Sequence, residues 1–116
     1  MKDKDTVILN KILSYCNQCE EACEMFENDF EKFKSVSVFH NSCCMCILQI
    51  GELCKLLSVQ LKESQSSVKW KEWCGIRDVF AHQYSNLDYD SAWDTIQNDL
   101  KDLKKSVNAI LEKRLI

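Results

Sequence analysis

The side chains best suited to phosphate and proton chemistry gather in one short stretch, residues 75–84. If this stretch is helical, Asp78 precedes His82 by one turn, where its carboxylate can accept the ring N–H and favour the imidazolium. Arg77 adds a planar fork of N–H donors that suits a phosphate. This set could cleave a phosphodiester. From spacing alone, an arginine and a histidine satisfied by carboxylates on a solvated helix end is the favoured interpretation.

Eight cysteines form the second chemically notable group. Two C-x-x-C pairs, Cys16 with Cys19 and Cys43 with Cys46, match metal-ligand spacing. Both pairs lie in apolar helical patterns without a turn residue, where a free thiol behaves as a small hydrophobe. We therefore expect core packing, with no structural metal, disulfide or cofactor. A metal held between two helices, or redox chemistry, is the alternative.

Composition indicates the scaffold that must position these groups. The chain has 116 residues, 46% hydrophobic, with no proline and two glycines, so the turn residues of β-rich folds are scarce. A chain of this length fits one domain, and we expect it to span residues 1–116. No apolar stretch reaches the roughly 18 residues of a membrane span, and the start is not a secretory signal. We expect an all-α protein located in the cytoplasm, without membrane contact.

Apolar periodicity predicts where the helices lie. A first helix is expected to about residue 26, followed by a short looser segment, and a central helix over 36–61. After a linker at 62–67, a third helix is expected over 68–84, and Asp88 is a good N-cap for a fourth. These elements predict an antiparallel four-helix up-down bundle. Gly51, inside the central helix, costs roughly 1 kcal/mol there and is best tolerated where another backbone comes close.

The stretch 77–84 resembles the R-x4-H-x-Y motif of the HepT-like ribonucleases, a branch of the HEPN superfamily. Three further segments, in the same order, resemble that family: the I-G-E segment within 46–58, a tryptophan and a glycine before the motif, and a D-x4-W that opens the last helix. In this chain the tryptophan and the glycine before the motif are Trp70 and Gly75, and the D-x4-W consists of Asp88 and Trp93. The resemblance covers about residues 41–103. Two positions depart from the pattern, because Asp78 stands where the family more often has asparagine, and Val68-Lys69 where it often has a proline.

The resemblance implies an endoribonuclease toxin that needs no metal and is paired with a minimal nucleotidyltransferase antitoxin. The 2′-OH of the RNA would attack the adjacent phosphodiester, Arg77 would hold the phosphate, and His82 would act as general acid or base. Asp78 would orient His82. Tyr84, two helical turns from Arg77 on nearly the same face, would receive AMP from the antitoxin and thereby block the phosphate site. The alternative is a tyrosine that packs its ring and hydrogen-bonds a nearby carboxylate.

A homodimer follows from helix geometry as well as from the resemblance. Arg77 and His82 lie five residues apart, about 140° around a helix, so one motif points its two groups apart. Two copies of the end of the predicted third helix, paired across a two-fold axis, would bring both sets into one cleft. Glu52 and Lys55 could line that cleft, or they could be a structural hydrogen-bonding group and a surface lysine.

The net charge of −3 does not suit indiscriminate binding of nucleic acid, so any RNA site must be local. Five basic residues fall in the predicted second and third helices and their linker: Lys55, Lys62, Lys69, Lys71 and Arg77. They could form a basic cleft or only a solvated face. The alternative function is a non-catalytic module of the same fold, serving as the partner or substrate-binding subunit of a nucleotidyltransferase. A purely structural or metal-binding bundle is the third interpretation.

Overall fold

The computed structural model describes residues 3–81 and 88–114, and every regular element over these residues is helical. The first half contains α1 (Lys4–Met25), α2 (Phe30–Ser35), α3 (Ser37–Leu56) and α4 (Val59–Ser64). The second half contains α5 (Trp70–Cys74), α6 (Ile76–Ala81), α7 (Tyr89–Asp94), the π-helical turn η1 (Thr95–Asp99) and α8 (Leu100–Arg114). The expected all-α class is confirmed. None of the described helices is long and apolar enough to cross a bilayer.

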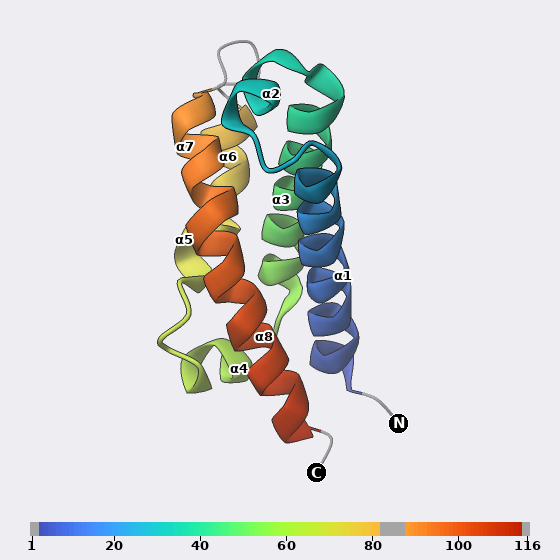
Figure 1. Cartoon of the computed structure of the whole chain (residues 1–116). Helices are drawn as coiled ribbons and strands as arrows, with labels where there is room; N and C mark the ends of the chain where they lie inside the picture. The colour runs from blue at the N-terminus through green and yellow to red at the C-terminus, as the bar shows by residue number, and fades with distance from the viewer. Residues whose placement is uncertain (1–2, 82–87, 115–116) are drawn as a thin grey trace.

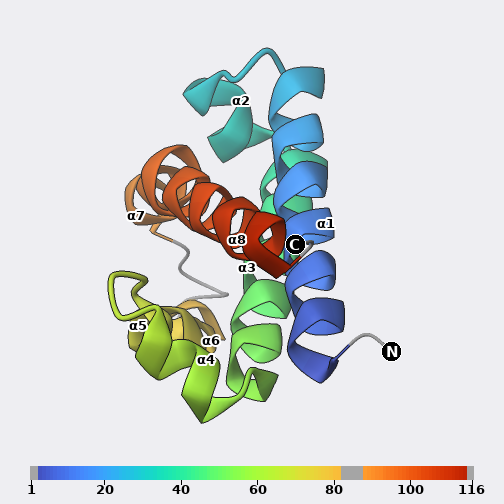
Figure 2. The same ribbon diagram turned by 90° about the horizontal axis from the view of Figure 1, so that it is seen from below.

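The long helices α1, α3 and α8 build the body of the molecule. In Figure 1, α1 rises from the N-terminus, α3 descends beside it, and α8 descends across them to the C-terminus. Contacts join α1 to α3 and to α8, while α5 and α6 contact α3. Seen from below in Figure 2, α4, α5 and α6 group on one side of α8, and α2 lies on the other. The segment with the candidate site residues, 75–81, therefore packs against α3.

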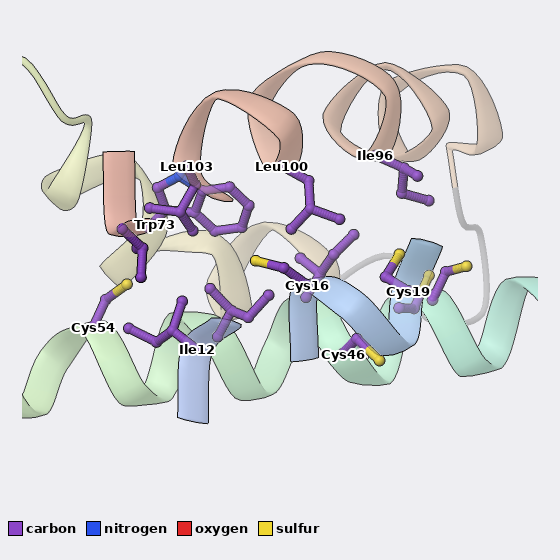
Figure 3. Close-up of a cluster of buried hydrophobic side chains, with 14 of the residues drawn as sticks. Ile12, Cys16, Cys19, Cys46, Cys54, Trp73, Ile96, Leu100 and Leu103 are labelled. Atoms are coloured by element: carbon purple, nitrogen blue, oxygen red, sulfur yellow. The ribbon is translucent and has the colours of Figure 1, made fainter. Parts of the chain in front are cut away.

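Among the described residues, the buried apolar side chains form one cluster with a high share of thiols. Side chains of α1, α3, α5 and α8 meet in it, as the labelled residues of Figure 3 show. Seven cysteines are buried and Cys74 is partly exposed, so the expectation that the cysteines pack as small apolar groups is confirmed.

The predicted central helix over 36–61 is wrong at its C-terminal end. It stops at Leu56, and Leu57 turns into an extended conformation before α4 begins. Ser58 causes the break, because its hydroxyl accepts the N–H of Leu61 as an N-cap. The carboxylate of Asp5, from the start of α1, in turn accepts the N–H and the hydroxyl of Ser58. A contact over 53 residues thus ends a helix that apolar periodicity would continue.

The predicted helix over 68–84 is also divided. Its described part consists of α5 and α6, separated by Gly75, which closes α5 by donating its N–H to the carbonyl of Lys71. The linker expected over 62–67 is shorter, because α4 runs to Ser64. Positions 82–84 of the predicted helix lie outside the described residues.

The last predicted helix is present from the expected start. Asp88 is the N-cap, and its carboxylate accepts the N–H and the hydroxyl of Ser91. The run then continues through α7, η1 and α8, with a π-helical turn at 95–99 that periodicity does not reveal. Trp93 anchors the start of this run against Phe33, with ring centroids 5.1 Å apart.

Gly51 marks the closest approach between α3 and the segment that carries Arg77. A Cβ at this position would lie 2.5 Å from Cγ2 of Ile76 and 2.7 Å from the carbonyl oxygen of Trp73. Both distances are shorter than any ordinary contact, so a side chain here would push α5 and α6 away from α3. The expectation that Gly51 permits a close backbone approach is confirmed.

We predict that Gly51→Ala lowers the free energy of unfolding by about 1–3 kcal/mol, the usual cost of overpacking, despite the helix propensity of alanine. Gly75→Ala is the matched control, because a Cβ there would lie no closer than 3.5 Å to any atom outside its immediate neighbours. Its backbone angles also suit alanine, so it should leave stability unchanged or raise it by up to about 1 kcal/mol. Urea denaturation measures both. Equal effects of the two substitutions would contradict the close approach at Gly51.

Candidate active site

Arg77 is the second residue of α6 and projects from the surface, with 62% of its side chain exposed. The neighbouring Ile76 packs against the core beside Gly51. Phe80, one turn later, is buried and holds the other end of α6 to the core. Arg77 therefore stands on a short helix that is anchored on both sides of it.

Glu52 and Lys55 of α3 lie beside Arg77. One Nη1–H of Arg77 donates to Oε1 of Glu52 at 3.0 Å, and Nζ of Lys55 approaches the same oxygen at 3.4 Å. The contact follows from the close approach described above, because Glu52 succeeds Gly51 and Arg77 succeeds Ile76. The structure thus brings together three of the predicted site residues from two separate segments.

The trio carries one net positive charge. The hydrogen bond that Arg77 donates to Glu52 lowers the pKa of the Glu52 carboxyl, and the interaction with Lys55 lowers this pKa by a smaller amount. Partial desolvation acts in the opposite direction. Glu52 is therefore ionised at neutral pH and compensates one of the two cations. Arg77 has five N–H donors, so the bond to Glu52 orients the guanidinium and leaves donors for an anion. A phosphate is the ligand that this arrangement suits best.

Asp78 is exposed in the first turn of α6, directly after Arg77. Its backbone N–H donates to the carbonyl of Gly75. His82 and Tyr84 lie outside the described residues. The orientation of His82 by Asp78 and the placement of Tyr84 relative to Arg77 therefore stay predictions.

Two of the other basic residues, Lys62 and Lys71, lie beside acidic residues rather than in a positive cleft. Lys62 and Lys71 line an open hollow of about 360 Å³ between α4 and α5. Glu63 and Glu72 line the same hollow, so its formal charges balance. This hollow therefore does not extend the positive charge around Arg77.

From the sequence, Glu52 is expected to be either a cleft residue or a structural hydrogen-bonding group. The structure makes it the direct partner of Arg77. A signal for this contact was present in the interior glycine that precedes Glu52, because a glycine in a buried helix indicates which face another backbone approaches. The identity of the approaching segment could not be read from that signal.

Comparison with known proteins agrees with the family resemblance of the sequence motifs. Residues 12–110 match the model of the family described as Ribonuclease HepT-like. A provisionally named RNase of Caldanaerobacter subterraneus subsp. tengcongensis is 34% identical over 97 residues, which cover 83% of this chain and 87% of that protein. A provisionally named RNase of Methanocaldococcus jannaschii is 28% identical over 104 residues, which cover 90% of this chain and 88% of the Methanocaldococcus protein. No solved structure matches the chain with significance.

Proposed function

The chain belongs to the HepT-like ribonuclease family, and from that membership we propose that it is a metal-independent endoribonuclease whose phosphate anchor is Arg77. The observation that carries the proposal is the exposed guanidinium of Arg77, held in place by Glu52 beside a second cation, Lys55. The names of the two relatives, both provisional RNases, support RNA as the substrate.

The proposed reaction is an internal transfer within the RNA. The 2′-oxygen attacks the adjacent phosphorus, its proton passes to a general base, and the bond to the 5′-oxygen of the next nucleotide breaks as that oxygen takes up a proton. The products are a 2′,3′-cyclic phosphate and a 5′-hydroxyl. His82 would move these protons, worth about 10²–10⁴-fold in rate, with Asp78 as its positioning residue.

Arg77 would stabilise the negative charge that develops on the phosphoryl oxygens. A donor placed where charge develops contributes most when it is oriented before the reaction begins. Glu52 supplies that orientation by accepting one N–H of the guanidinium. Glu52 is therefore a positioning residue in this proposal, and Lys55 a second electrostatic contact to the RNA.

We also propose that the active form is a homodimer joined along α3. Three exposed apolar residues, Val38, Met45 and Leu56, are separated by 7 and 11 positions on this helix. At 100° per residue they fall within about 20° of one another and form a stripe. Glu52 lies seven residues after Met45, close to the same stripe. A second copy packed on it would bring the two Arg77 sites near each other.

Within this proposal the chain is the toxin of a toxin–antitoxin pair in the cytoplasm. A minimal nucleotidyltransferase would transfer AMP from ATP to Tyr84, which forms a bond between the phenol oxygen and the α-phosphorus. Pyrophosphate leaves and the phenol proton is released. The added phosphate would be an anionic ligand for Arg77 and would compete with RNA.

We predict that Arg77→Ala lowers the rate of RNA cleavage by at least about 100-fold, the usual effect of losing one donor to a developing oxyanion. Arg114→Ala is the matched control, because the only other arginine of the chain binds Asp3 at the far end of the bundle. Cleavage of a labelled RNA in the presence of a chelator gives the rate, and the cyclic phosphate identifies the chemistry. If folded wild-type protein cleaves no RNA, the non-catalytic module is favoured instead.

We predict that Met45→Arg converts a dimer into a monomer, because it places a charge in the middle of the apolar stripe. Met25→Arg is the control, since Met25 is also exposed but ends α1 rather than lying on α3. Light scattering at micromolar concentration measures the mass. A monomeric wild-type protein, or loss of the dimer in both variants, would rule out the α3 interface.

We predict that Tyr84→Phe abolishes labelling by ATP and a minimal nucleotidyltransferase of the proposed antitoxin type. Tyr89→Phe keeps a phenol at position 84 and should be labelled like the wild type. Intact-mass analysis detects each added AMP, and the RNA assay shows whether the labelled protein has lost activity. Equal labelling of both variants would place the modification elsewhere.

A further inference from the structure

Three buried thiols meet where α1 faces α3. Cys19 and Cys23 lie one turn apart on α1, and Cys43 lies opposite them on α3. Their sulfur atoms are all within 4.8 Å of one another. Figure 3 shows Cys19 at the end of the core cluster that Ile96 of η1 also occupies. Among the described residues this is the one group of three or more side chains whose ligand atoms converge in this way.

The group differs from the metal site that C-x-x-C spacing would suggest. It takes Cys19 from one such pair and Cys43 from the other, while Cys16 and Cys46 stay outside it. Cys23 belongs to neither pair. Helix geometry explains the selection, because positions four apart on one helix share a face and a facing helix can add a third group to it. The sequence alternative of a metal between two helices therefore has a concrete, different ligand set.

The dimensions suit a thiolate-bound metal. A metal–sulfur bond of about 2.3 Å in tetrahedral geometry separates two sulfurs by about 3.8 Å. Sulfurs already within 4.8 Å need to move only slightly to reach that separation. All three come from long helices, so the backbone already holds their arrangement before any ion arrives.

An open pocket gives access to the group. It has a volume of about 310 Å³ and is lined by Cys23 together with polar residues of α1, η1 and α8 and the turn after α1, among them Glu20, Asn28, Gln97 and Lys101. A cation can reach Cys23 from this side, and the pocket has room for a water or another small ligand. The π-helical turn η1 forms one wall, at a type of irregularity that is frequent at functional sites.

We propose that Cys19, Cys23 and Cys43 bind a divalent, thiolate-preferring ion, Zn²⁺ or Cd²⁺, whose fourth ligand is supplied from the pocket. Three bonds to sulfur form, and the protons still held by the thiols are released to solvent. A divalent ion leaves one net negative charge on the site, which Lys101 can balance. A monovalent ion would leave two buried negative charges, which is far more costly.

Ion binding is a further property of thiols that also fill the core as small apolar groups. The same three side chains belong to the buried apolar cluster that joins α1 and α3. A bound ion would link α1 to α3 next to η1 and stabilise that end of the bundle. The site is separate from the Arg77 site on α6.

The test uses the full-length protein, reduced and stripped of metal, titrated with Cd²⁺ and in parallel with Zn²⁺. Native mass spectrometry should show one bound ion per chain, and the ultraviolet thiolate-to-cadmium band should saturate at one equivalent. Cys23→Ala and Cys43→Ala should weaken binding by at least roughly tenfold, since losing even an outer-shell partner costs that much. Cys16→Ala and Cys54→Ala are matched controls, because both thiols are buried but lie outside the group.

A measurement on the wild type keeps the test decisive if a variant unfolds. ¹¹³Cd NMR of the loaded protein should show a single resonance in the range of three sulfur ligands, and a thermal melt should shift upward with added ion. Absence of binding to the wild type would overturn the proposal. Equal losses in the control variants, a cadmium shift typical of oxygen ligands, or binding of Cu(I) without Zn²⁺ or Cd²⁺ would overturn it as well.

Discussion

The close approach of α3 to the α5–α6 segment at Gly51 is the constraint on which the rest of the molecule depends. Only a residue without a Cβ leaves room there for the side chain of Ile76 and the carbonyl of Trp73. This contact sets how the two segments face each other. Glu52, which follows Gly51, therefore lies opposite Arg77, which follows Ile76. The pairing of Glu52 with Arg77 is therefore a consequence of backbone packing rather than an isolated surface ion pair.

The thiol-rich core likewise allows α1 and α3 to lie close together. A cysteine side chain is small and apolar, so helices lined with cysteines can lie close together without long side chains between them. The cost of such a core is that sulfur atoms become neighbours. Cys19, Cys23 and Cys43 converge in this way. Their thiols fill the interface, and thiols are also soft metal ligands.

The sequence by itself determined the helical class and most of the helix positions. Apolar side chains recur with the helical period because each helix buries one face, so the pattern directly reports the presence of a helix. Local signals also located the N-cap at Asp88 and the need for close contact at Gly51. Four motif segments in family order were sufficient to indicate the HepT-like family, which the match over residues 12–110 shows.

Only the tertiary structure decided where the helices break and which polar groups meet. The helix expected over 36–61 ends early because Asp5, far away in sequence, binds Ser58. The contact of Arg77 with Glu52 likewise joins residues 25 positions apart. Periodicity describes which face of each helix is buried, but it contains no information on how helices rotate and slide against one another. The convergence of side chains from separate helices depends on that relative placement, and so it required the folded molecule.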